Sequence, residues 1–121
     1  MALKGSDLLT EVFEEFGNQP DRIVIFANTA SPADFARFAP KTVQAAIHAD
    51  PAGVAILKSG AGHIEETALA LGFAPGDALC LLGGVGPRYQ SFLGENFTRN
   101  IVAPQGSALD GAIQLARGMS A

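Results

Sequence analysis

The feature that most constrains the fold of this chain is a short apolar run that ends in a cluster of glycines. Residues 78–82 (Ala-Leu-Cys-Leu-Leu) are typical of a buried strand, and Gly83, Gly84, Val85 and Gly86 follow directly. Because glycine lacks a Cβ, a glycine pair at a strand end lets the backbone approach a flat ligand and permits positive φ. Crevices beyond the carboxyl ends of strands are favoured ligand sites in α/β sheets. The pattern favours a nucleotide site, although a tight turn explains an isolated Gly-Gly-x-Gly more often.

A second apolar run follows the glycines and leads into a helix. Residues 100–103 form this run, and residues 107–113 open the helix with small and acidic residues. A dinucleotide-binding loop of the Rossmann type is excluded here, because the third glycine is missing and Pro87 stands where the phosphate-binding helix would begin. The order of elements is therefore strand, glycine loop, strand and helix.

The first 72 residues have the pattern of consecutive helices. Residues 7–16 form an amphipathic helix, with apolar side chains at a spacing of three and four. Further helices are expected after the cap at Ser31, from Pro40, and over residues 50–72, where Asp50 caps the longest helix. Residues 22–27 stay ambiguous, since β-branched side chains favour a strand whereas the preceding proline suits a helix. Residues 73–77 form a turn.

Two glycines inside the longest helix need an explanation. Gly60 and Gly62 each cost about 1 kcal/mol relative to alanine. We expect the close approach of another backbone to compensate this cost, with a ligand contact as the second possibility.

The other residues with chemical potential have simpler explanations. Cys80 is the sole cysteine, which excludes an intrachain disulfide and a cysteine zinc site, and we expect a small buried hydrophobic side chain there. His63 and its acidic neighbours do not have metal-binding spacing and are expected on a solvated helix face. Asp34 and Asp110 each follow a serine by three residues, where helix capping accounts for them.

Composition bounds the class of protein. The 121 residues, 48% of them hydrophobic, are enough for a single domain, residues 1–121. The net charge is −4 and the eight Lys and Arg are scattered, so nucleic acid is not an expected partner. No uncharged apolar run approaches the roughly 20 residues that cross a bilayer. We therefore expect no membrane association and a cytoplasmic location.

Several short motifs, taken in order, resemble a known family. They lie at residues 30–36, 38–40, 45–46, 49–51, 81–85, 103–104 and 108–112. Together they resemble the C-terminal part of the bacterial N-acetylglucosamine kinase and BadF-type ATPase family, in the superfamily of sugar kinases, actin and heat-shock chaperones. The resemblance extends over nearly the whole chain.

The resemblance implies a fold and a site. The fold would be α/β and mostly helical, a partial ribonuclease H-like C-terminal lobe of an actin-like ATPase with two short strands and about five to six helices. Residues 20–27 would be helical. Gly83, Gly84 and Val85 would line the adenine and ribose, with Gly86 adjacent and the final helix packed beneath. The complete enzyme would use ATP and Mg to phosphorylate an amino sugar.

The resemblance also implies what this chain does not contain. The glycine-rich phosphate loops and the catalytic aspartate of such kinases have no match here, so we expect no catalytic or metal-binding residue and no activity from this chain alone. It would be the C-terminal lobe without the N-terminal phosphate-binding lobe, as a fragment or a truncated relative. Exposed strand edges would favour a homo-oligomer. The alternatives are a non-catalytic interaction module and a BadF-type ATPase that activates a dehydratase.

Overall fold

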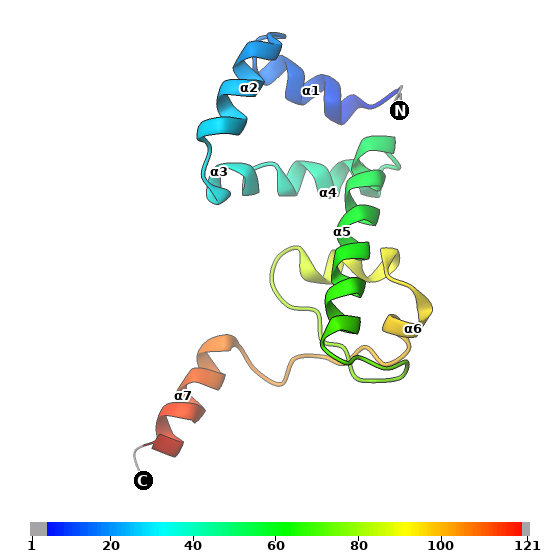
Figure 1. The fold of residues 1–121 in the computed structure, drawn as a ribbon, viewed down its shortest axis with the longest axis vertical. Coiled ribbons are helices and arrows are strands. Elements are labelled where there is room, and N and C mark those ends of the chain that lie inside the picture. Colours follow the sequence, from blue (N-terminus) through cyan, green and yellow to red (C-terminus); the bar gives the residue numbers. More distant parts are fainter. Residues whose placement is uncertain (1–4, 120–121) are drawn as a thin grey trace.

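The computed structural model describes residues 5–119 and is a chain of helices (Figure 1). Seven α-helices and one 3-10 helix are found in that range: α1 (Asp7–Glu15), α2 (Pro20–Thr29), α3 (Pro32–Ala36), α4 (Ala39–Ile47), α5 (Pro51–Ala70), η1 (Gly86–Phe92), α6 (Glu95–Thr98) and α7 (Ala108–Met119). The expected helices in the first 72 residues are confirmed, and the ambiguous segment 22–27 is helical. Residues 86–98 also contain helical turns, which the sequence pattern did not predict.

The predicted α/β fold is wrong, because the described residues contain no strand. Residues 78–82 and 100–103 do run parallel, but they meet in one isolated β-bridge between Leu79 and Ile101. Two backbone hydrogen bonds form it, from the Leu79 amide to the Asn100 carbonyl at 3.0 Å and from the Val102 amide to the Leu79 carbonyl at 2.9 Å. Two short segments without neighbouring strands gain too few such bonds to form a sheet.

Asp50 ties the beginning of α1 to the beginning of α5. One carboxylate oxygen accepts hydrogen bonds from the Ala52 amide at 2.9 Å and the Gly53 amide at 3.2 Å, which caps α5. The same oxygen accepts from the Ser6 hydroxyl at 2.8 Å, and the other accepts from the Leu8 amide at 3.0 Å. Ser6, which is buried, caps α1 in turn. One side chain therefore holds two helix ends together.

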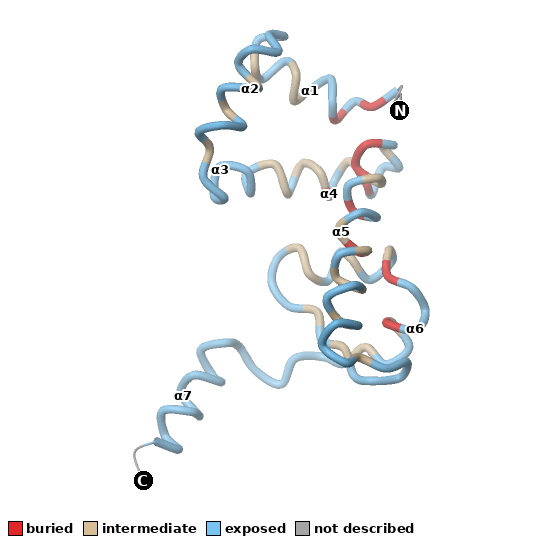
Figure 2. The backbone as a smooth tube through the Cα atoms, in the orientation of Figure 1, coloured by how far each residue is buried: buried red, intermediate tan, exposed pale blue. Residues whose placement is uncertain are grey.

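Helices α4 and α5 cross closely and carry the first of two small cores. A Cβ built on Gly53 would lie 2.7 Å from the Ala46 backbone nitrogen, so only glycine fits at the crossing. Val43, Ala46 and Leu57 are buried beside it. The second core lies further along α5, where Ala61, Leu93 and Phe97 are buried. Figure 2 shows these buried positions along α5, at its crossing with α4 and at α6.

A group of phenylalanine rings joins α1, α2, α3 and the start of α4. Phe26 lies at its centre, with ring centroids 5.3 Å from Phe16, 5.3 Å from Phe35 and 5.7 Å from Phe38. Edge-to-face contacts of this kind are favourable arrangements of aromatic rings. They hold α2 to its neighbours, although no residue of α2 is buried.

Several details of the predicted packing are corrected. Gly60 faces a side chain rather than a backbone, since an added Cβ would lie 2.6 Å from the Tyr89 hydroxyl oxygen, and nothing lies within 4 Å of one at Gly62. Cys80 is exposed, because the run around it does not become a buried strand. Ile47 of α4 and Leu71, which follows α5, are apolar but 56% and 84% exposed.

The final helix, α7, lies away from the rest of the chain in Figure 1. None of its residues is buried, and Leu109, Leu115 and Met119 are among the exposed apolar side chains. The expectation that this helix packs beneath the glycine loop is therefore wrong. In the described part of the chain, no helix is long and apolar enough to cross a membrane.

Candidate nucleotide-binding site

The glycine loop adopts a conformation that requires glycine at one position and leaves space at the next. Gly83 has a φ of +83°, a region that side-chain-bearing residues rarely adopt. Gly84 has no such constraint, and nothing lies within 4 Å of a Cβ built on either residue. A Cβ on Gly86 would make ordinary contacts with Leu81, the nearest at 3.5 Å. Backbone at residues 83 and 84 is therefore open to an approaching molecule.

The residues after the glycines anchor this loop to the helices. The Arg88 amide donates a hydrogen bond to the Val85 carbonyl at 2.9 Å, which forms the first turn of η1. Val85 packs against the core of Val43, Ala46 and Leu57. The open backbone is thus held by a packed segment, which keeps the loop against α4 and α5.

A hollow of about 430 Å³ lies between the glycine loop and the beginning of α4. Ala36, Ala39, Pro40, Val43, Gln44, Gly84, Val85 and Arg88 line it. Of these eight residues, those that belong to α4 are apolar except Gln44, and Arg88 is the one charged residue. The structure brings Gly84 and Val85 to this hollow, whereas Gly83 and Gly86 do not line it.

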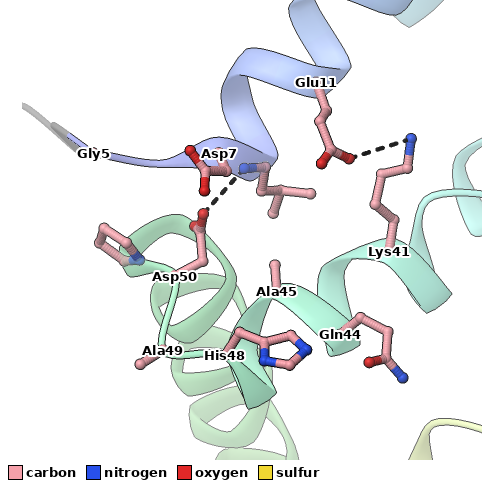
Figure 3. A pocket seen from close by; sticks show the side chains of 11 residues that line it. Gly5, Asp7, Glu11, Lys41, Gln44, Ala45, His48, Ala49 and Asp50 are labelled. Carbon is pink, nitrogen blue, oxygen red and sulfur yellow. Dashed lines mark hydrogen bonds and ion pairs between the residues drawn. The ribbon is translucent and has the colours of Figure 1, made fainter.

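A second hollow, of about 400 Å³, lies between α1, α4 and the turn before α5 (Figure 3). Charged residues line it, and Glu11, Lys41 and Asp50 among them already have partners. The Lys41 ammonium binds Glu15 and lies 3.8 Å from a Glu11 carboxylate oxygen, and the hydrogen bond to Glu15 raises the pKa of Lys41. The Asp50 carboxylate is occupied by the bonds that cap α1 and α5, the Leu8 amide foremost, and they lower its pKa. This hollow lacks the apolar walls that a flat base requires.

The carboxylates with lowered pKa outside that hollow are caps. Ser31 and Asp34 form a capping box at α3, and the Ser31 amide, 2.9 Å from the carboxylate, lowers the pKa of Asp34. The Ser107 amide, at 2.8 Å, does the same to Asp110. Both confirm the capping interpretation. Across residues 5–119, no group of three or more His, Cys, Asp or Glu side chains is arranged to hold a metal ion.

Of the acidic residues beside His63 in α5, Glu65 makes a contact that the sequence did not indicate. The Glu65 carboxylate accepts a hydrogen bond from the Gly94 amide at 2.8 Å and so fastens the start of α6 to α5. His63 lies 3.9 Å from Glu66, and both are exposed, as expected of a solvated helix face.

Of the predicted site residues, Gly84 and Val85 line the hollow, and the sequence pattern did not indicate the wall that faces them. Pro40, Val43 and Gln44 lie three or four residues apart and so share one face of α4. The motif at residues 38–40 contributed to the resemblance but received no role. That face could not be matched to the glycine loop without knowing that η1 folds back onto α4.

Comparison with known proteins finds an amino-sugar kinase among the relatives of this chain. Glucosamine kinase GspK of Vibrio cholerae serotype O1 is 33% identical over 105 residues, which are 87% of this chain and 36% of that protein. The chain thus spans about a third of the length of the relative that it matches. No family model matches the chain. No solved structure matches it either.

Proposed function

We propose that this chain is the adenosine-binding, C-terminal portion of an ATP-dependent amino-sugar kinase. The observation that carries the proposal is the 33% identity to a glucosamine kinase over most of this chain. The relative's name supplies the reaction class, phosphoryl transfer to a sugar, and the resemblance of the glycine loop to an adenosine motif supplies the part played by these residues.

The dimensions and chemistry of the hollow support an adenosine site. Small-molecule sites are concave, mostly apolar and usually about 300–1,000 Å³ in volume, and the hollow beside Gly84 and Val85 has about 430 Å³. Apolar side chains of α4 provide one flat wall, and the loop provides another where backbone lacks obstructing Cβ atoms. A purine base fits such walls.

The remaining steps of the reaction belong to the complete enzyme in this proposal. Phosphoryl transfer depends on groups that position the phosphates, neutralise their charge and orient the attacking hydroxyl. Among the described residues, the carboxylates of Asp34 and Asp110 accept hydrogen bonds in helix caps and are not free to take such a role. Mg²⁺ and the amino sugar would therefore be held by the portion of the kinase that corresponds to the rest of the relative's length.

Replacement of Gly84 by valine tests the proposal. Because Gly84 has ordinary φ and no neighbour within 4 Å of an added Cβ, we expect Gly84→Val to fold normally and to fill the hollow. In ¹H–¹⁵N NMR spectra, Mg-ADP should shift the amide signals of residues 84–88 in the wild-type chain and leave them unshifted in Gly84→Val.

Two further results make the test decisive. Gly62→Ala, a substitution at another open glycine, is the matched control and should bind as the wild type does. Shifts that persist unchanged in Gly84→Val would place the nucleotide elsewhere and refute the site.

A non-catalytic interaction module is the second candidate function. Its support is the exposure of apolar side chains on α7, such as Leu109 at 69% and Leu115 at 73%. No comparable observation favours a BadF-type ATPase that activates a dehydratase.

A further inference from the structure

Two polar residues line the hollow beside the glycine loop, one on each wall, and Gln44 also lines the hollow of Figure 3. Arg88 lies in η1, three residues after Val85, which directly precedes that helix. Residues three apart lie on the same side of a 3-10 helix, and both line the hollow. Gln44 follows Pro40 by four residues on α4, and residues four apart share a face of an α-helix. Each wall therefore presents one polar residue beside apolar ones.

Both side chains are available to a ligand. Within residues 5–119, neither the Arg88 guanidinium nor the Gln44 amide has a hydrogen bond or ion pair to another described side chain. No carboxylate lines the hollow. A guanidinium beside apolar walls, without a counter-ion, suits an electron-rich planar group, because arginine stacks on aromatic faces.

We propose that Arg88 and Gln44 select the nucleotide base at this site. Arg88 lies across the face of the base, and Gln44 hydrogen-bonds its edge. A glutamine amide offers one donor group and one acceptor, which matches the amino group and N7 of adenine, whereas guanine presents two acceptors, N7 and O6, on the same edge. A guanidinium offers only donors, and in the plane of a base it pairs best with guanine. Gln44 at the edge with Arg88 on the face therefore gives a preference for adenine.

This inference rests on the proposed function, and the test separates the two. Chemical-shift titrations of the wild-type chain with Mg-ADP and with Mg-GDP, each to about 10 mM, detect the millimolar dissociation constants expected of a partial site. We expect ADP to shift residues 84 and 85 at lower concentration than GDP does. Absence of any shift there with either nucleotide would overturn both the function and the inference.

Substitutions of Arg88 test its stacking role. Arg88→Ala should weaken ADP binding about tenfold, and Arg88→Lys should recover only part of that loss, because lysine keeps the charge but not the plane. Arg99→Ala removes the same charge from an exposed position outside the hollow, and it should change the dissociation constant less than twofold. ADP binding that is equally strong in Arg88→Ala, with shifts still at residues 84 and 85, overturns the role of Arg88 and leaves the proposed site standing.

Substitution of Gln44 tests the reading of the base edge. Gln44→Leu keeps the approximate size of the side chain and removes its hydrogen bonds, so ADP and GDP should then bind with dissociation constants within about twofold of each other. A preference for ADP that persists in Gln44→Leu, or a preference for GDP in the wild-type chain, overturns the role of Gln44.

Discussion

Single residues in this chain perform structural tasks that their local sequence only partly indicates. Asp50 precedes a proline and was expected to cap the helix that follows, as it does. It also accepts hydrogen bonds from Ser6 and the Leu8 amide, more than 40 positions away. The capping role follows from neighbouring residues, whereas the second role exists because α1 returns to the start of α5.

Asp50→Asn should destabilise the fold at neutral pH. An asparagine amide has one acceptor oxygen where the carboxylate has two, so it cannot serve the amides of α5 together with the Leu8 amide and the Ser6 hydroxyl. We expect a lower midpoint of urea unfolding than in the wild type. The control, Asp34→Asn, affects only the short capping box of α3 and should have the smaller effect.

The difference between wild type and Asp50→Asn should disappear in acid. Folding lowers the pKa of Asp50, chiefly through the Leu8 amide, so the carboxylate stabilises the fold fully above its ordinary pKa of 3.8. That stabilisation is lost as the pH falls through the lower pKa of the folded state. Urea midpoints measured from pH 6 down to about pH 2 test this, because the series must pass below the lowered pKa of the folded state. A difference that stays constant would contradict it.

Among the elements, α5 organises the molecule because it contacts α1, α4 and η1. Its glycines have different surroundings that the sequence pattern could not distinguish. Gly53 lies against the backbone of α4, and Gly60 lies against the side chain of Tyr89. Nothing lies within 4 Å of a Cβ built on Gly62. Helix propensity predicts the same gain from alanine at each site, so any difference among them comes from packing.

The same substitution at two of these glycines should have opposite effects. Gly62→Ala should raise the free energy of unfolding by about 1 kcal/mol, the difference in helix propensity. Gly53→Ala should lower it, because the added methyl group would lie 2.7 Å from backbone that cannot move without separating α4 from α5. Urea unfolding followed by circular dichroism measures both. Stabilisation by Gly53→Ala would show that the helices do not cross so closely.

The whole molecule is an open arrangement with two small cores, and many large apolar side chains are exposed. The exposed strand edges that were expected to favour a homo-oligomer are reduced to one bridge between Leu79 and Ile101. Self-association stays a prediction. The apolar side chains Leu109, Leu115 and Met119 of α7 are also exposed. Because none of its residues is buried, α7 adds little to the stability of the rest.

Removal of α7 should leave the remaining fold intact. A chain that ends at Pro104 should unfold within about 2 °C of the full chain, because a loss of 1 kcal/mol would shift the midpoint of a small domain by about 4–8 °C. Helical circular dichroism should fall by the contribution of residues 108–119 alone. A fall in the midpoint beyond 5 °C would mean that α7 packs against the body in solution.

Local sequence was sufficient for the helices of the first 72 residues, for α7, for the predicted caps and for the turn at residues 73–77, because these depend on spacing and on hydrogen bonds within a few residues. It did not indicate η1 and α6. It was not sufficient for the strands, since residues 78–82 and 100–103 extend into a ladder only where other strands pair with them. Nor could it place Pro40, Val43 and Gln44 opposite Gly84. That wall depends on η1 packing onto α4 and α5, a contact between segments that are distant in the sequence.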